Sequence, residues 1–462
     1  MDIILLAINW PDVGSKIAQL LLSLSILIIL HEFGHYITAR WFKCRVEKFY
    51  LFFDPWFSIV KKKVGDTVYG IGWLPLGGYV KISGMVDESM DKEQLKQPPQ
   101  PWEFRSKPAW QRLIIMLGGV TMNMLLAFFL YAMILFVWGE KKIDNSSVKN
   151  GIYCADSLLI KFGFQHGDKI ISINDKPAKY FDDIPGEIIT SDKVKVNRNG
   201  KEELLIMPPD LIGQLVELKK KGVGFLELRR PAMVGDMSDK IFDTLPAKMA
   251  GLKQFDKIIS IDSTPVQFFD EIGLILQHKK NDTVQIEIER NNEKKILTSK
   301  VGADGKIGLM YIGVEEMDSL KLLKIQEKKY DFFAAFPAGV RKAGEKLQAY
   351  YNQFRKIVNP NTGGYKAVGG FKGIASIFPT PWNWEAFWSL TAFLSIMLAF
   401  MNLLPIPALD GGHVLFTLGE MITGRKPSEK FLEYAQIVGF VILLALMLYA
   451  NGNDWFGWGK RN

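Results

Sequence analysis

The chain has 462 residues, of which 48% are hydrophobic and 23% are charged, and its formal net charge is +8. The charge is unevenly distributed, because four windows contain no Asp, Glu, Lys or Arg: Ile17–Leu30, Leu113–Gly139, Ala386–Leu409 and Tyr434–Asn453. A membrane-spanning helix needs ~20 predominantly apolar residues, and the first window reaches that length if a single Glu is tolerated. We therefore expect four membrane-spanning helices, which excludes a soluble globular enzyme.

Lys and Arg gather beside these windows. They follow the first window, precede the second and lie between the third and fourth. Because cytoplasmic loops are enriched in Lys and Arg, both termini and residues 140–384 are expected outside the cytoplasm, and the positive charge indicates membrane orientation rather than nucleic-acid binding. The two cysteines, Cys44 and Cys154, would then lie on opposite sides of the bilayer, so we predict no disulfide.

The large outer segment contains an internal repeat. Gly163–Asn174 aligns with Gly251–Asp262, and both copies contain Asp-Lys-Ile-Ile-Ser-Ile. The pattern resembles the PDZ fold; a Gly, Gly167, precedes the Asp in the first copy, whereas Phe255 stands there in the second. PDZ domains bind extended peptides by adding a strand to a sheet edge. Two tandem copies therefore indicate a recognition or filtering unit rather than a catalytic one.

The sequence His31-Glu32-Phe33-Gly34-His35, at the end of the first apolar stretch, has the H-E-x-x-H pattern. Residues four apart on an α-helix lie on one face about one turn apart, so both imidazoles could bind one metal ion. Glu32 would lie beside them and could accept a proton from the water that the metal activates. Ionisable residues inside a membrane span are costly and usually mark function, which favours this interpretation over an interfacial polar cluster.

A third ligand is expected near the end of the third window, in Asn402-Leu-Leu-Pro405-Ile-Pro407-Ala-Leu-Asp410-Gly-Gly-His413. The two prolines should break the helix, and the paired glycines allow close backbone approach. We expect Asp410 to be presented from an unwound segment inside the membrane, where it completes a three-ligand catalytic zinc site. His413 is expected near the site but not on the metal.

Together, H-E-F-G-H and N-x-x-P-x-P-x-L-D-G-G-H resemble the site-2 protease family of intramembrane zinc metalloproteases, and within it the bacterial regulator-of-sigma-E type. The resemblance covers essentially the whole chain. It implies Zn²⁺ held by His31, His35 and Asp410, with Glu32 as catalytic base, and substrate binding by Asn402. Tyr69–Lys81 resembles the family's membrane-associated β-loop, which implies substrate contacts by Gly77, Gly78 and Tyr79.

Two other segments bear on this resemblance. Phe332–Tyr351 has apolar positions at helical spacing and a basic opposite side, which predicts an amphipathic interfacial helix or an ordinary helix packed on the second PDZ domain. A Gly-Pro-x-x-Asn stretch that is common in the family reads Gly119-Val-Thr-Met-Asn123 here, so Asn123 is kept without the proline. A family Gly-Pro likewise reads Gly370-Phe371.

The predicted fold class is a polytopic α-helical membrane protein with four transmembrane helices, a membrane-associated β-loop and tandem extracytoplasmic PDZ-type α+β domains. The segments expected are first span 1–40, cytoplasmic region with the β-loop 41–107, second span 108–139, PDZ-type domains 140–231 and 232–318, amphipathic segment 319–384, third span 385–412, cytoplasmic loop 413–433, and fourth span with the C-terminal tail 434–462.

The predicted function is hydrolysis of peptide bonds inside transmembrane segments of already trimmed proteins, of the anti-sigma-factor or remnant-signal-peptide type, in a bacterial inner membrane. The expected partners are transmembrane substrates and the lipid bilayer, without nucleic acid or a nucleotide cofactor. A catalytically silent PDZ scaffold and a metal or ion transporter are the alternatives. Two His and one carboxylate also occur in non-haem iron oxygenases, although H-E-x-x-H on a helix favours zinc.

Overall fold

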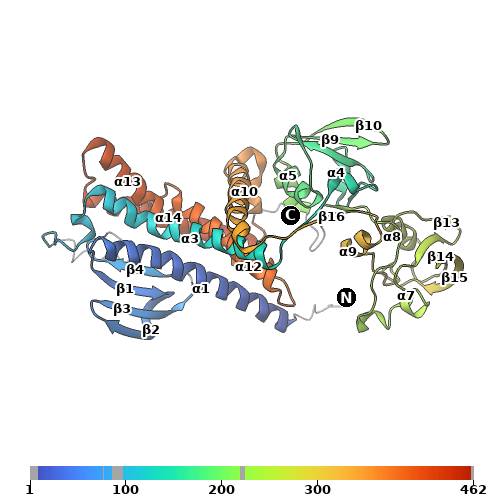
Figure 1. Ribbon diagram of the computed structural model, residues 1–462, viewed down its shortest axis with the longest axis horizontal. Helices are drawn as coiled ribbons and strands as arrows, with labels where there is room; N and C mark the ends of the chain where they lie inside the picture. Colours follow the sequence, from blue (N-terminus) through green and yellow to red (C-terminus); the bar gives the residue numbers. More distant parts are fainter. Residues whose placement is uncertain (1–8, 76, 86–96, 219–223, 459–462) are drawn as a thin grey trace. The chain divides into compact units, whose positions relative to one another are not determined.

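The computed structural model describes residues 9–75, 77–85, 97–218 and 224–458 (Figure 1). The chain forms two compact units. The first, here called the helical unit, comprises Met1–Gly139, Lys329–Arg355 and Val368–Asn462. The second, here called the two-lobed unit, comprises Glu140–Lys328 and Lys356–Ala367.

Within the described residues, four helices of the helical unit are long and apolar enough to cross a membrane: α1 (Trp10–Trp41), α3 (Ala109–Val137), α12 (Trp384–Leu403) and α14 (Glu429–Phe456). The expectation of four apolar helices is confirmed. The third helix ends earlier than the predicted 412, because Pro405 and Pro407 have no backbone N–H to continue it. The segment expected as a loop, 413–433, is helical as far as Thr423, since it lies largely in α13 (Asp410–Thr423).

A four-stranded sheet follows α1 and lies alongside it (Figure 1). Its strand order is β2-β3-β1-β4, with β1 at Val46–Leu51, β2 at Phe53–Val64, β3 at Thr67–Leu74 and β4 at Tyr79–Ile82. The β2–β3 hairpin closes through Gly65, whose φ of 60° suits a tight two-residue turn. Among the described strands, β4 pairs only with β1, so its other edge has no neighbour in this sheet. The β character predicted for Tyr69–Lys81 is confirmed.

The segment predicted as an amphipathic helix forms α10 (Phe332–Val358), which is longer than expected. Its buried positions are small: Ala335, Ala338, Gly339 and Ala343. A Cβ on Gly339 would lie 2.5 Å from the backbone nitrogen of Ala132, so the absence of a side chain lets α10 pack directly on α3. Phe333 on the opposite side is 84% exposed. The helix is therefore anchored by its small residues and leaves aromatic residues outside. A short helix, α11 (Phe371–Ser376), completes the unit.

The two-lobed unit begins with lobe 1, formed by residues 140–231 and 312–328. Its main sheet has the order β10-β9-β7-β8, and two strand pairs, β11–β6 and β16–β5, lie outside that sheet. Its elements are β5 Glu140–Ile143, β6 Ile152–Cys154, α4 Ser157–Lys161, β7 Lys169–Ile173, β8 Lys176–Pro177, α5 Ile184–Thr190, β9 Lys193–Arg198, β10 Lys201–Ile206, α6 Leu211–Leu218, β11 Leu226–Leu228, α9 Val314–Ser319 and β16 Ile325–Lys328.

Lobe 2, residues 232–311, repeats this plan. Its sheet has the order β13-β12-β14-β15, and its elements are α7 Pro246–Met249, β12 Lys257–Ile261, β13 Thr264–Pro265, α8 Phe269–Gln277, β14 Thr283–Arg290 and β15 Glu293–Lys300. The turn Asn174-Asp175 after β7 has positive φ at both residues, and so does Asp262-Ser263 after β12 in lobe 2, as a type I′ hairpin requires. The repeat seen in the sequence is therefore a repeat of structure.

The chain returns to lobe 1 after completing lobe 2. Ile312, Met317 and Leu323 are buried in the core of lobe 1, although the predicted boundary of the second domain was residue 318. The return could not be predicted from the repeat, because it depends on which apolar core the later residues reach.

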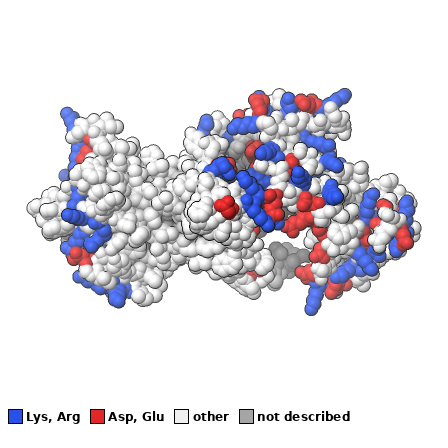
Figure 2. Space-filling model, viewed as in Figure 1, with Lys and Arg blue, Asp and Glu red and all other residues white. Residues whose placement is uncertain are grey.

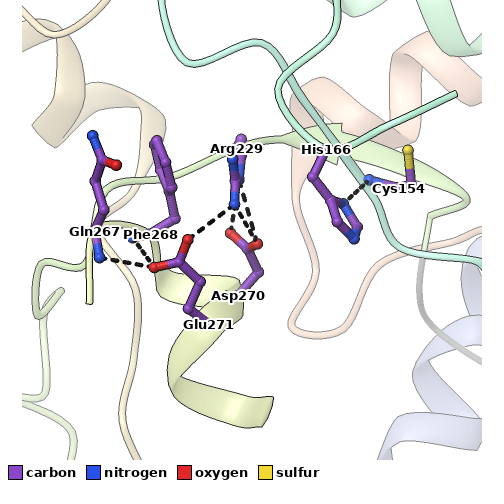
Figure 3. A network of polar contacts seen from close by, with 7 residues as sticks. All are labelled: Cys154, His166, Arg229, Gln267, Phe268, Asp270 and Glu271. Carbon is purple, nitrogen blue, oxygen red and sulfur yellow. Dashed lines mark hydrogen bonds and ion pairs between the residues drawn. The ribbon is translucent and has the colours of Figure 1, made fainter. Parts of the chain in front are cut away.

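Arg229 at the end of β11 links the two lobes. Its guanidinium bonds Asp270 and Glu271 at the start of α8 and lies 3.7 Å from the centre of the Phe268 ring (Figure 3). On the lobe 1 side of this view, His166 Nδ1 accepts a hydrogen bond from the Cys154 backbone. Both cysteines, Cys44 and Cys154, are buried and free.

Candidate metal centre

Three possible ligand atoms meet inside the helical unit. His31 Nε2 and His35 Nε2, both from α1, are 3.3 Å apart, and each lies 3.3 Å from Oδ2 of Asp410. Tetrahedral zinc with ligand bonds of ~2.0–2.1 Å would hold neighbouring ligand atoms about 3.3–3.4 Å apart. Asp410 Oδ2 is buried and has no hydrogen-bond partner within the described part of the chain, as expected of an atom that faces a cation. The residues present therefore fit zinc.

Glycines let α1 and α3 approach closely enough to form this site. A Cβ on Gly34 would lie 2.2 Å from the carbonyl oxygen of Gly118, so the two helices touch through their backbones. A Cβ on Gly119 would lie 2.4 Å from His35 Nε2 and 2.6 Å from His31 Cε1. Gly34 of H-E-F-G-H and the pair Gly118-Gly119 of α3 are thus packing requirements of the site. No sequence pattern around Gly119 predicted this role.

Asp410 follows the two prolines, Pro405 and Pro407, that come after the end of α12. Helix α12 ends at Leu403, just before the two prolines, and Asp410 is the first residue of α13 rather than part of the unwound segment that the sequence predicted. That correction has a physical reason, because an Asp is stabilised by the unpaired N–H groups and positive dipole of a helix N-terminus. A Cβ on Gly411 would lie 2.1 Å from the carbonyl oxygen of Leu404, so the predicted close approach of the Gly pair is present.

A second layer of hydrogen bonds orients the imidazoles. His35 Nδ1 donates to the Ile115 carbonyl at 2.9 Å, which leaves its Nε2 free to bind a metal. His31 Nδ1 lies 3.2 Å from the Asn123 side-chain amide, whose Oδ1 has no partner. Turning this amide by 180° lets Oδ1 accept from Nδ1–H and satisfies both groups, so we infer that orientation. Asn123, which the family resemblance singles out without a role, therefore contacts a candidate ligand.

Some of the other predicted site residues lie at the ligand cluster, and others lie away from it. Asn402 Nδ2 lies 3.2 Å from His31 Nε2, at the ligand cluster itself. A Cβ on Gly78 would lie 3.4 Å from Glu32 Cγ, and the Val80 backbone hydrogen-bonds to Glu32. The edge strand β4 thus runs directly past the predicted base.

Gly77 and Tyr79 face the sheet rather than the ligands. A Cβ on Gly77 would lie 2.9 Å from the ring of Phe53, and the Tyr79 hydroxyl donates to Asp54 at 2.8 Å. His413, further along α13, is not part of the three-residue cluster of possible ligands found among the described residues. The close cluster therefore consists of His31, His35 and Asp410, with Glu32, Asn402 and Gly78 beside it.

Comparisons with known proteins agree with this geometry. The model of a family described as Peptidase family M50 matches residues 19–446. Proteins named for an inferred zinc metalloprotease activity are similar: one from Thermotoga maritima is 26% identical over 94% of this chain and 97% of its own. One from Borreliella burgdorferi is 28% identical over 93% and 95%. The regulator of sigma E protease of Haemophilus influenzae is 24% identical over 95% of this chain and 98% of its own.

The chain therefore belongs to peptidase family M50, the site-2 protease family. It is a zinc metalloendopeptidase with apolar helices suited to a membrane.

Proposed function

We propose that this protein cuts peptide bonds within the membrane, with zinc held by His31, His35 and Asp410 and with Glu32 as the catalytic base. The observation that carries the proposal is the equal 3.3 Å spacing of three buried ligand atoms that come from two apolar regions far apart in the sequence. The position of Glu32 next to His31 in the chain and beside the edge strand β4 adds to it.

When bound, zinc polarises the substrate carbonyl and makes water more acidic. Glu32 accepts the proton from the attacking water and then donates it to the leaving amine. The hydrogen bond from His35 to the Ile115 carbonyl keeps the imidazole in the tautomer that can ligate. The unpaired edge of β4 can align an unwound substrate by strand addition, at Gly78, and the Asn402 amide can hydrogen-bond its backbone.

The test separates chemistry from metal binding. Glu32→Gln should keep zinc but lower cleavage of a model transmembrane peptide about 10³-fold, because Gln cannot accept the proton. Asp410→Ala should lose zinc and cleavage together. Glu385→Gln, an exposed carboxylate in the first turn of α12, is the control and should change neither. Full zinc in Asp410→Ala, or substantial cleavage by Glu32→Gln, would overturn the corresponding assignment.

The substrates that we propose are transmembrane segments of proteins already trimmed outside the membrane, of the anti-sigma-factor or remnant-signal-peptide type. The name of the Haemophilus influenzae relative, regulator of sigma E protease, supports this class. We further propose that the two lobes are PDZ-type domains that exclude substrates with bulky outer domains; their repeated sheet order supports the PDZ likeness. Joining Gly139 to Lys329 should keep zinc and allow cleavage of untrimmed substrates. If this deletion variant still does not cleave untrimmed substrates, the two lobes are not what excludes them.

The proposed orientation puts both termini and the two-lobed unit on the outer side of a bacterial inner membrane. The Lys and Arg clusters next to the apolar helices support it. In a variant without Cys44 and Cys154, a lone cysteine near Asp256 should react with an impermeant thiol reagent in cells with a permeabilised outer membrane. One near Lys62 should not react. The opposite pattern would reverse the orientation.

A further inference from the structure

We propose that a basic pocket at the Trp41 end of α1 binds the phosphate group of an anionic phospholipid. The pocket is an open cavity of about 450 Å³, a size that suits a headgroup. Its lining consists of three cations, one acid, a thiol and an indole: Arg40, Lys43, Arg45, Asp66, Cys44 and Trp102. None of these residues belongs to the candidate metal centre.

Among the residues that the structure describes, the cations of this pocket have few partners. Within the described part of the chain, the side chains of Arg40 and Lys43 make no hydrogen bond or ion pair, and Arg45 reaches only Asp66, at 4.0 Å. Both members of that pair are exposed, so it contributes little. The lining therefore has two positive charges in excess of its single acid.

Capping of α1 does not explain these cations either. Basic side chains near a helix C-terminus can pair with its last carbonyl groups. Here the carbonyls of Thr38, Ala39 and Arg40 already accept backbone N–H groups from the residues that follow the helix. The positive charge is therefore available for an external anion.

The surroundings indicate a lipid headgroup rather than a free phosphate. Trp41 and Trp110 are 76% and 49% exposed, as expected of aromatic residues at a membrane surface. Ile37 and Phe33 precede Arg40 by three and seven residues, so they share its face of α1, and both are exposed apolar side chains. An acyl chain can lie along this apolar track while its phosphate meets the pocket.

The charge distribution of the helical unit agrees with this assignment. Figure 2 shows Lys and Arg gathered at the end of the unit that carries the sheet, next to a long uncharged zone over the helices. Basic pockets at the ends of membrane helices bind anionic headgroups, and each Lys or Arg increases the affinity about fivefold.

The experiment uses the full zinc-loaded protein in nanodiscs of phosphatidylcholine with a minor share of phosphatidylglycerol. After mild detergent extraction, the phosphatidylglycerol retained per protein is counted by native mass spectrometry. The pocket variant is Arg40→Gln with Lys43→Gln and Arg45→Gln. The control is Lys61→Gln with Lys62→Gln and Lys63→Gln, which removes the same charge from exposed positions of β2 outside the pocket.

The wild type and the control should retain phosphatidylglycerol selectively, and the pocket variant should lose roughly a hundredfold in affinity. Asp66→Asn removes the one acid of the pocket and should strengthen retention, which keeps the test valid if the triple variant folds poorly. Equal retention by the pocket variant and the control, or weaker retention by Asp66→Asn, would overturn the proposal. Zinc content, measured on the same samples, reports the metal centre separately.

A second arm distinguishes a lipid from a free anion. Inorganic phosphate is added to the extracted complexes at concentrations in excess of the lipid. The lipid should stay bound, because phosphate cannot occupy the apolar track of Phe33 and Ile37. Displacement of phosphatidylglycerol by phosphate alone would assign the pocket to a soluble anion and overturn the lipid assignment.

Discussion

The helical unit and the two-lobed unit reach their structures by different means. In the helical unit, three ligand atoms come from two distant regions and meet only because glycines let the backbones touch, as at Gly34 and Gly118. In the two-lobed unit, the same contact within a lobe occurs twice. Asp168 bonds Arg198 in lobe 1, and Asp256 bonds Arg290 in lobe 2.

These paired contacts match in detail. Each Asp is about 1% exposed, accepts the backbone N–H three residues before it, and binds both Nε and Nη2 of its Arg. The hydrogen bond to Asp168 is the main cause of the raised pKa of Arg198, and the hydrogen bond to Asp256 acts in the same way on Arg290. The metal site therefore depends on contacts that each occur once and join residues as far apart as His31 and Asp410, whereas the buried ion pair of each lobe joins residues 30 or 34 positions apart and occurs in two copies.

The largest loss of zinc binding and cleavage is expected at the close contact between Gly119 and the two imidazoles of the metal centre. Gly119→Ala should abolish cleavage and most zinc binding, because the new Cβ would lie 2.4 Å from His35 Nε2. Gly419→Ala in α13 is the matched control, since a Cβ there meets nothing within 4 Å. It should leave zinc unchanged and stabilise the helix by up to about 1 kcal/mol. Bound zinc is measured by mass spectrometry; near-normal zinc in Gly119→Ala would contradict the packing argument.

A smaller loss of zinc affinity is expected when a hydrogen bond that orients a ligand is removed. Asn123→Leu removes the acceptor for His31 Nδ1–H and should weaken zinc binding about 10–100-fold while the fold persists. Asn123→Asp keeps an acceptor and should bind zinc better than the Leu variant. Competition with a chelator of known affinity measures both. Equal zinc affinity of the two variants would show that Asn123 does not orient His31.

In the lobes, breaking one copy should leave the other intact. Asp168→Ala should destabilise lobe 1 by about 3 kcal/mol, because it removes one partner of a buried ion pair. Burial raises the pKa of Cys154 to about 12, so this thiol reacts only after lobe 1 opens. Asp168→Ala should therefore speed Cys154 labelling roughly 100-fold, whereas Asp256→Ala should not. If both variants speed it equally, the lobes unfold as one body.

The smallest effect concerns the residue before each Asp. Gly167 and Phe255 have φ angles of 92° and 68°, a region that favours glycine. Gly167→Ala should therefore lower the free energy of unfolding of lobe 1 by about 1 kcal/mol. In lobe 2, the Phe255→Gly variant should be more stable than the Phe255→Ala variant by a similar amount. Hydrogen exchange of the strand that follows each position measures the change. The reverse order at 255 would mean that side-chain packing outweighs backbone strain there.

Much of this organisation could be predicted from the sequence. The charge-free windows predict the four apolar helices, because the length and apolarity of a span are local properties of the sequence. The H-E-x-x-H pattern predicts two imidazoles on one face, because the geometry of an α-helix is fixed. The repeated Asp-Lys-Ile-Ile-Ser-Ile gives two similar sheets for the same reason. In each case the information lies within a short stretch of chain.

Only the tertiary structure decided how distant segments meet. The start of α13 at Asp410, the contact of Gly119 with both imidazoles and the hydrogen bond between Asn123 and His31 join residues that are far apart in the chain or depend on a helix boundary. The return of Ile312 to the core of lobe 1 is of the same kind. Such contacts arise from the packing of whole elements against one another, and a local pattern of residues does not specify which surfaces will touch.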